Sequence, residues 1–201
     1  MSELSLPYLG SIPNRLLRLY AGLVLYGTGI GLQVESRLGN DPWDVFHQGL
    51  SIRTGWSIGT WIILVGAIVM VFWIPLRQRP GIGTISNIVF VGLFADLTIW
   101  LAPTPEALAV RWVYLLAAVV FVGVATGLYI GAGMGPGPRD GLMTGLARLG
   151  LSIRTARTLI ELVVLATGWL LGGTVGLGTI VFAVAIGPLT QFFMPLMRPR
   201  R

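Results

Sequence analysis

Six strongly apolar stretches recur along the chain, separated by short segments rich in glycine, proline and charged residues. A helix needs about 20 apolar residues to cross the hydrocarbon core of a bilayer. Because a backbone in lipid must satisfy its own hydrogen bonds, we expect all six stretches to be helices. They are Leu16–Glu35, Ser57–Leu76, Thr84–Leu101, Arg111–Ile130, Ala156–Leu171 and Thr179–Met197.

The segments between these stretches repeat in the two halves of the chain. The break Gly39-Asn40-Asp41-Pro42-Trp43-Asp44 returns 96 positions later as Gly135-Pro136-Gly137-Pro138-Arg139-Asp140. The turn Gly81-Ile82-Gly83-Thr84 returns 95 positions later as Gly176-Leu177-Gly178-Thr179. The shared glycine, proline and aspartate positions indicate that both halves derive from one unit.

Each half contains three of the predicted crossings, one break and one Gly-x-Gly-Thr turn. Because three is an odd number, the second half enters the membrane in the opposite orientation, which makes the halves an inverted repeat. We assign the first repeat to about residues 16–101 and the second to about 111–197. The link 102–107 is short and marked by proline. The predicted fold is therefore an all-α membrane protein of six transmembrane helices, with residues 1–201 in a single membrane domain.

A short helix is expected after each break. Proline is favourable at the first helical position because its missing N–H would be unpaired there, and Pro42 and Pro138 both follow this rule. A helix over Pro42–Ile52 would be about 16 Å long, roughly half a bilayer. Two placements fit the sequence. The short helices re-enter the membrane with their N-termini near its midplane, or they lie at its surface as amphipathic segments.

Composition and charge support a membrane protein and give its orientation. Hydrophobic residues make up 54% of the sequence and charged residues 11%, whereas about a quarter of a soluble domain is charged. With six crossings and a cytoplasmic N-terminus, eleven of the 14 arginines lie inside, so the C-terminus is cytoplasmic too. The positive-inside rule explains this asymmetry without a nucleic acid partner. The inside arginines are Arg15, Arg18, Arg77, Arg79, Arg139, Arg148, Arg154, Arg157, Arg198, Arg200 and Arg201.

Asp44 and Asp140 are the acidic pair that both halves share. Each lies in the first turn of an expected short helix, where a carboxylate accepts from free backbone amides, so capping alone explains both. Two opposed helix N-termini also frame a polar site, because each carries the positive end of a helix dipole. A buried carboxylate there binds a cation or carries a proton, whereas the amides hold an anionic group. The sequence leaves these roles open.

Other polar residues lie beside this pair or inside the predicted crossings. Arg139 either neutralises its neighbour Asp140 or contacts an anion. Ionisable residues within a span are costly and usually face an interior or a cavity. For Glu161 the alternative is an ion pair with Arg157 or Arg154 on the same helix. The candidate site residues are Asn40, Asp41, Asp44, Arg139 and Asp140 for substrate binding, and Asp96, Glu161, His47 and Gln191 for coupling or support.

Chemistry based on cysteine or on histidine clusters is excluded. The chain has no cysteine and a single histidine, so no thiolate or multi-histidine metal site is expected. The segment Gly55-Trp56-Ser57-Ile58-Gly59 fits the Gly-x-Ser-x-Gly pattern of serine hydrolases. That motif needs a strand–turn–helix setting and a partner histidine, whereas Ser57 here opens a predicted membrane helix as its N-cap. We expect no enzymatic activity, no metal and no cofactor.

The size of the chain, its six predicted spans, its two breaks and its two Gly-x-Gly-Thr turns together resemble the bacterial YczE/YitT-type integral membrane proteins. The resemblance covers most of residues 16–197. It implies a protein of the bacterial cytoplasmic (inner) membrane and brings no catalytic residues with it. Gly137 stands where the first half has Asp41, so the resemblance does not imply a role that both halves share at this position.

Two functions of different classes fit these observations. The first is a small transporter or channel for a small polar or charged solute or ion, with proton coupling as an option, whose site lies at the interface of the repeats. The second is a non-transporting scaffold or accessory subunit whose glycine-rich faces pack against a larger membrane complex. Besides the lipid bilayer, the second function would require a membrane partner protein or a second copy of the chain. A water-accessible pocket reaching Asp44 and Asp140 would favour the first.

Overall fold

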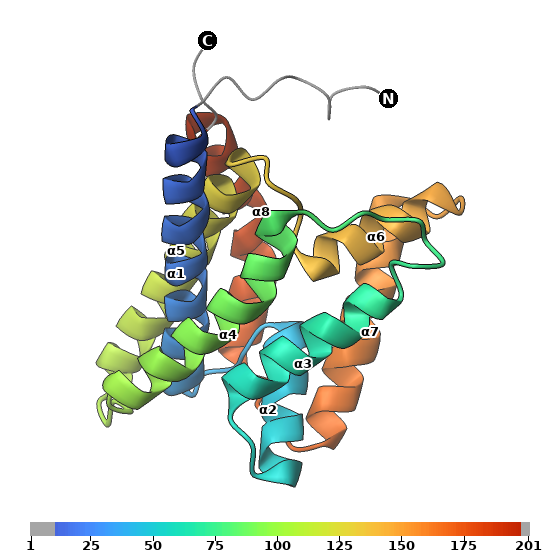
Figure 1. Ribbon diagram of the computed structural model, residues 1–201. Coiled ribbons are helices and arrows are strands. Elements are labelled where there is room, and N and C mark those ends of the chain that lie inside the picture. The colour runs from blue at the N-terminus through green and yellow to red at the C-terminus, as the bar shows by residue number, and fades with distance from the viewer. Residues whose placement is uncertain (1–10, 198–201) are drawn as a thin grey trace.

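The computed structural model describes residues 11–197, and its regular secondary structure in that range consists of helices joined by turns and loops (Figure 1). The all-α prediction is thereby confirmed for this part of the chain. Arg198, Arg200 and Arg201, which the charge argument counts as cytoplasmic, lie outside the described residues. The helices are α1 (Ile12–Ser36), α2 (Pro42–Thr54), α3 (Ile58–Val71), α4 (Ile82–Leu101), α5 (Leu108–Gly131), α6 (Pro138–Arg148), α7 (Ile153–Leu170) and α8 (Leu177–Met197).

The helices of the two halves follow the same order. α1 and α5 are the long first helices, α2 and α6 are the short helices after the breaks, and α3–α4 and α7–α8 complete each half. α1 packs along α5 (Figure 1), with α4 against α1 and α8 against α5. α2 packs on α7 and α3 on α6. Each of these contacts has its counterpart when the halves are exchanged, which is the pattern that two related halves produce.

Three helices, α4, α5 and α8, are each long and apolar enough to cross a membrane. α2 and α3 together would form a fourth span, but they are bent by 115° relative to each other. Two of the other helices expected to cross the membrane, α1 and α7, are not apolar enough to meet this requirement. α1 is rich in glycine, and α7 carries Arg154, Arg157 and Glu161. The arrangement of six crossings therefore remains a prediction. The second predicted crossing also ends early as an α-helix, at Val71, four residues before Pro75.

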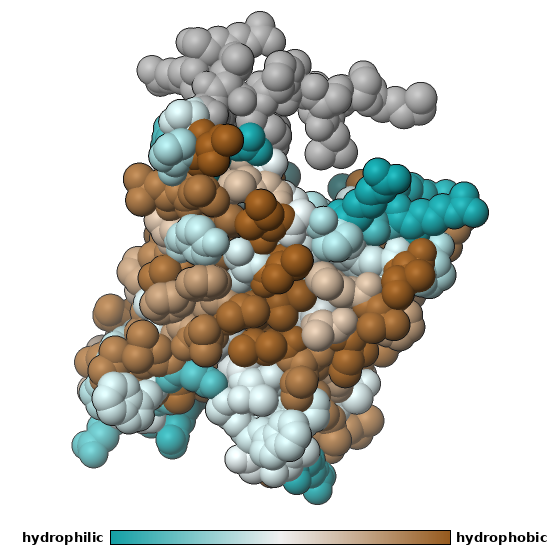
Figure 2. Space-filling view, in the orientation of Figure 1, coloured by the Kyte–Doolittle hydropathy of each residue, from teal (hydrophilic) through white to brown (hydrophobic). Residues whose placement is uncertain are grey.

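The surface of the molecule suits a lipid environment. Figure 2 shows hydrophobic residues across the middle of one face and hydrophilic residues gathered toward its ends. The side chains of Trp100, Leu170 and Val184 are 80%, 75% and 70% exposed. Large apolar patches are rare on soluble monomers, whereas lipid tails are as apolar as these side chains.

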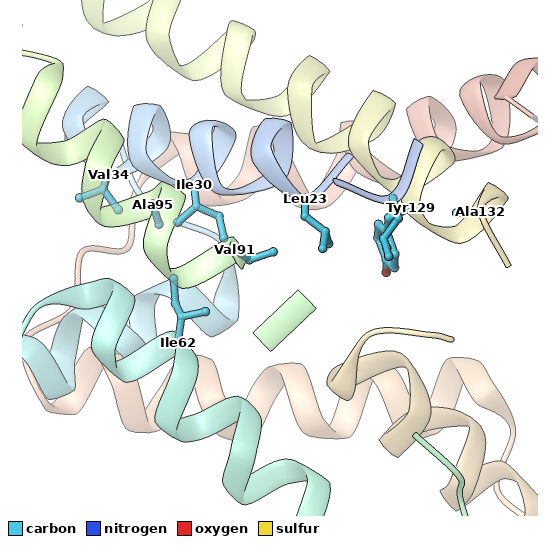
Figure 3. Packing of buried hydrophobic residues seen from close by; sticks show 9 residues of the cluster. Leu23, Ile30, Val34, Ile62, Val91, Ala95, Tyr129 and Ala132 are labelled. Atoms are coloured by element: carbon cyan, nitrogen blue, oxygen red, sulfur yellow. The ribbon is translucent and has the colours of Figure 1, made fainter. Parts of the chain in front are cut away.

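The core lies around α1. Leu19, Leu23 and Ile30 are almost fully buried and belong to a cluster that α4 and α5 complete (Figure 3). Glycines on α1 allow this close approach. A Cβ atom added at Gly27 would lie 2.6 Å from a backbone oxygen of α4, and one at Gly22 would lie 2.9 Å from a backbone nitrogen of α5. Small residues thus set the helix spacing, as is usual in membranes.

Each break is held by the Gly-x-Gly-Thr turn of the other half. The backbone nitrogen of Gly178 donates to the carbonyl of Leu38 at 2.7 Å, and that of Gly83 donates to the carbonyl of Met134 at 2.8 Å. The two motifs that the sequence repeats are therefore joined crosswise. We call these two contacts the break–turn contacts. The first joins residues 38–40 to residues 174–179, and the second joins residues 134–137 to residues 81–84.

Alanine at Gly39 is expected to destabilise the protein more than alanine at Gly150. Both glycines have a positive φ, 115° and 104°, so both substitutions carry backbone strain of about 1–2 kcal/mol. A Cβ atom at Gly39 would also lie 2.6 Å from the backbone nitrogen of Gly176, whereas one at Gly150 meets nothing within 4 Å. The additional cost at Gly39 is about 1–3 kcal/mol. Thermal unfolding in detergent measures it, and equal losses would contradict the importance of the break–turn contact.

Candidate functional site

A cavity of about 380 Å³ lies between the two halves. Its wall includes the first residues of both short helices, Pro42 and Trp43 from α2 and Pro138, Arg139 and Asp140 from α6. Apolar residues of α3, α4, α5 and α8 form much of the remaining wall. This volume suits a small molecule.

Two aspartates begin α2, as the sequence predicts. Oδ1 of Asp41 accepts a hydrogen bond from the backbone nitrogen of Asp44 at 2.7 Å, and Pro42 takes the first helical position. Oδ1 of Asp44 lies 2.9 Å from Nδ1 of His47. Asp41, Asp44 and His47 are all buried. Capping therefore uses one oxygen of Asp41 and does not use the Asp44 side chain, which leaves both carboxylates available to other groups.

Arg139 reaches across from α6 to these two aspartates. Its Nη1 lies 3.6 Å from Oδ2 of Asp41, and its Nη2 lies 3.6 Å from Oδ1 of Asp44. The guanidinium carbon also lies 4.9 Å from the ring centroid of Trp43. These ion pairs join the starts of the two short helices, so the N-termini of α2 and α6 face one another.

Asp140 has a different partner from the one the sequence suggested. Tyr129 on α5 donates its hydroxyl to Oδ2 of Asp140 at 2.5 Å. The ion pairs of Arg139 within the described chain go to Asp41 and Asp44 and not to Asp140. The expectation that Arg139 neutralises its neighbour is corrected accordingly, because the side chain extends toward the other half.

Three of the predicted supporting residues line the cavity. They are His47, Glu161 and Gln191. Oε1 of Glu161 accepts from Nε of Arg157 at 2.8 Å, which is the same-helix ion pair that the sequence offered as an alternative role. Both residues nevertheless face the cavity, so the ion pair forms part of its wall.

Asn40, Asp44 and Asp96 lie outside the cavity wall. The Asn40 amide donates to Oε1 of Gln48 at 2.9 Å, and its backbone nitrogen donates to the carbonyl of Thr174 at 3.1 Å. Asn40 thus belongs to a break–turn contact. Asp96 accepts from Oγ of Ser57 at 2.5 Å and from the backbone nitrogen of Gly59 at 2.7 Å. These are groups at the N-terminus of α3, so Asp96 binds α4 to α3.

The contact that Asp96 makes has no equivalent in the second half. Gly59 and Gly92 touch where α3 packs on α4, and a Cβ atom at Gly92 would lie 2.6 Å from the carbonyl oxygen of Gly59. At an offset of 95 positions the counterparts of Gly59, Gly92 and Asp96 are Arg154, Gly187 and Gln191. A Cβ atom at Gly187 would meet nothing within 4 Å, and α7 does not pack on α8 as α3 packs on α4. The cavity reaches into this space, since Gly187 and Gln191 line it.

Comparison with known proteins places the chain in a family. Residues 13–195 match the family described as "Family of unknown function (DUF6198)". The chain belongs to this family. It is 43% identical over 176 residues to an "Uncharacterized protein" of Haemophilus influenzae, a match covering 87% of this chain and 81% of that protein. It is 34% identical over 179 residues to the "Uncharacterized membrane protein YczE" of Bacillus subtilis, covering 88% and 83%. No solved structure matches.

The YczE part of the resemblance drawn from the breaks and turns is thus confirmed. Another relative, "Uncharacterized protein YyaS" of Bacillus subtilis, is 27% identical over 183 residues, covering 88% of this chain and 90% of that protein. The family and the apolar helices identify a multi-pass membrane protein. The names of these relatives assign no activity, so the cavity is the basis for proposing a function.

Two tyrosines that line the cavity of this DUF6198 protein were not predicted from the sequence. They are Tyr26 on α1 and Tyr129 on α5, with ring centroids 6.1 Å apart. A signal was present, because a phenol hydroxyl inside an apolar span usually finds a hydrogen-bond partner. Their meeting at the cavity depends on the packing of α1 against α5, which the sequence pattern does not specify.

Proposed function

We propose that the protein is a transporter or channel for a small polar or charged solute, whose site is the cavity between the two repeats. The observation that carries this proposal is the convergence of two helix N-termini and three charged side chains, Asp41, Arg139 and Asp140, on that cavity. Asp44 does not line the cavity but pairs with Arg139, which does. Charged groups inside a membrane protein are costly and mark solute or ion pathways. Paired broken helices at a repeat interface are the usual setting of a transporter site.

In the first half α3 packs on α4, whereas in the second half α7 does not pack on α8 in this way. This difference between the halves favours a transporter over an open channel. α1 begins and α8 ends at one end of the molecule, and α7 also begins there (Figure 1). The N-terminus of α3, bound by Asp96, lies at the opposite end. If the start of α1 is cytoplasmic, the cavity is closed on the outer side and open toward the cytoplasm. Alternating access follows if α7 closes on α8 while α3 separates from α4.

Flux measurements on purified protein in liposomes test this function. We expect the wild-type protein to move at least one class of small amine, organic acid or inorganic ion in a broad screen. The double variant Asp44→Asn with Asp140→Asn is expected to reduce that flux to the level of empty liposomes, because it removes the cavity carboxylate of Asp140 and a carboxylate that holds the cavity residue Arg139. The control is Glu106→Gln, an equivalent change in an exposed loop, which should leave flux unchanged.

Two results would reject transport. One is the absence of flux for all solutes of the screen. The other is a double variant that moves solute at the wild-type rate. A partner protein that co-purifies in fixed proportion with an inactive chain would instead support the scaffold function.

A further inference from the structure

We propose that the transported solute carries a positively charged organic group, an ammonium or a guanidinium, which binds the carboxylate of Asp140. This inference rests on the proposed function and adds the class of solute to it. Three features of the cavity support it, namely its charge balance, an oxygen of Asp140 that accepts no hydrogen bond from the described residues, and an unpartnered polar atom of its wall.

The polar end of the cavity carries more negative than positive charge. Asp41 and Asp140 line the cavity, and Asp44 pairs with Arg139 outside the wall. Within residues 11–197 Arg139 is the one arginine paired with any of these three carboxylates. Buried charges without partners are unfavourable in proteins and more so inside a membrane. A positively charged solute reduces the imbalance, whereas an anion would increase it.

Asp140 is the carboxylate with room for a ligand. It lines the cavity, and its Oδ2 accepts the hydroxyl hydrogen of Tyr129. Its Oδ1 receives no hydrogen bond from the described residues, within which this side chain accepts the one hydrogen bond from Tyr129. Arg139 is already engaged with Asp41 and Asp44. A cation entering the cavity therefore finds a carboxylate oxygen that no protein group occupies.

A buried polar atom of the cavity wall lacks a partner among the described residues. It is Nε1 of Trp43, a residue that is 5% exposed and lines the cavity. An unpaired buried polar atom calls for a ligand or a water molecule. The carboxylate oxygen of Asp140 requires a donor, and the indole N–H requires an acceptor. A solute that has a cationic donor for Asp140 and a nearby hydroxyl or carbonyl oxygen for Trp43 satisfies both of these cavity residues.

Arg139 shows how a guanidinium fits this site. It lies 4.9 Å from the Trp43 ring and 3.6 Å from Asp41 and Asp44. An aromatic face beside carboxylates is the arrangement by which proteins recognise organic cations. The described residues hold no group of three or more His, Cys, Asp or Glu side chains suited to a metal ion. An organic cation is therefore favoured over a divalent metal.

Calorimetric titration of the purified full-length protein in detergent tests the inference. The probes are methylguanidinium and ethanolamine as cations, acetate and methyl phosphate as anions, and Mg²⁺ as a metal. We expect the two organic cations to bind. Asp140→Asn is expected to raise their Kd by about tenfold or more, because a charge-assisted hydrogen bond is lost. Glu106→Gln, which removes a carboxylate in an exposed loop, should leave Kd unchanged.

Three results would overturn the inference: binding of the anions alone, binding of Mg²⁺ alone, or no binding by any probe. An Asp140→Asn variant that binds the organic cations as well as the wild type would overturn it too. The liposome assay separates this outcome from failure of the proposed function. A protein that moves only anions remains a transporter with a different solute. A protein that binds methylguanidinium but moves no solute keeps the cation site and loses transport.

Discussion

Replacing Arg139 with methionine is expected to lower the free energy of unfolding by about 3–5 kcal/mol, the usual cost of removing one partner from a buried ion pair. The side chains of Asp41 and Asp44 are 6% and 2% exposed. Without the guanidinium the two carboxylates would face each other at the start of α2 with no cation beside them. Thermal or denaturant unfolding in detergent measures the loss.

Two further variants separate the ion pair from the packing of the long side chain. Adding Asp41→Asn and Asp44→Asn to Arg139→Met is expected to restore much of the lost stability, because the uncompensated charges are gone. Arg157→Met is the control. Its pair with Glu161 is 50% and 29% exposed, and such pairs contribute about 0–1 kcal/mol. If both single arginine variants lose the same free energy, the junction of α2 and α6 does not depend on charge.

Leucine at Gly92 is expected to destabilise the protein, whereas leucine at Gly187 is expected to leave its stability almost unchanged. A Cβ atom at Gly92 would lie 2.6 Å from the Gly59 carbonyl oxygen and 2.7 Å from a side-chain atom of Ile63. Overpacking of this kind costs about 1–3 kcal/mol. At Gly187 a Cβ atom meets nothing within 4 Å. The free energy of unfolding should therefore change by less than about 0.5 kcal/mol there.

Transport is the readout that makes the Gly187 variant informative. If α7 closes on α8 during each cycle, a leucine at Gly187 blocks that approach. A penalty of about 1.4 kcal/mol on the closed state reduces its population about tenfold, and flux through liposomes should fall with it. A Gly187→Leu protein that is stable and transports at the wild-type rate would show that α7 and α8 do not close on each other.

The repeated motifs made the starts of the short helices predictable. Pro42 and Pro138 each take the first helical position, and Asp41 caps α2 through its own side chain. These features depend on neighbours within four residues, so the local sequence contains all that is needed. The same holds for Ser57, which accepts from the Thr60 backbone nitrogen as the N-cap of α3.

Contacts between distant elements could not be predicted in this way. The sequence placed Asp96 inside a crossing but gave no sign that it binds the N-terminus of α3, 37 residues earlier. It placed Asn40 among the solute-binding residues because Asn40 belongs to the break, whereas its backbone nitrogen is tied to Thr174. The ion pair of Arg139 with the aspartates of the first half was missed because proximity in sequence favoured Asp140. In each case the partner belongs to another element of the fold and is set by the packing of the two elements.

The crosswise break–turn contacts have a consequence for biosynthesis. The backbone carbonyl of Leu38 receives its hydrogen bond from Gly178, a residue that leaves the ribosome 140 positions later. The break–turn contact of the first half therefore cannot form until nearly the entire polypeptide has been synthesised. Insertion into the bilayer must therefore begin before this hydrogen bond can form. Final assembly is a late event that joins a segment synthesised early to one synthesised late.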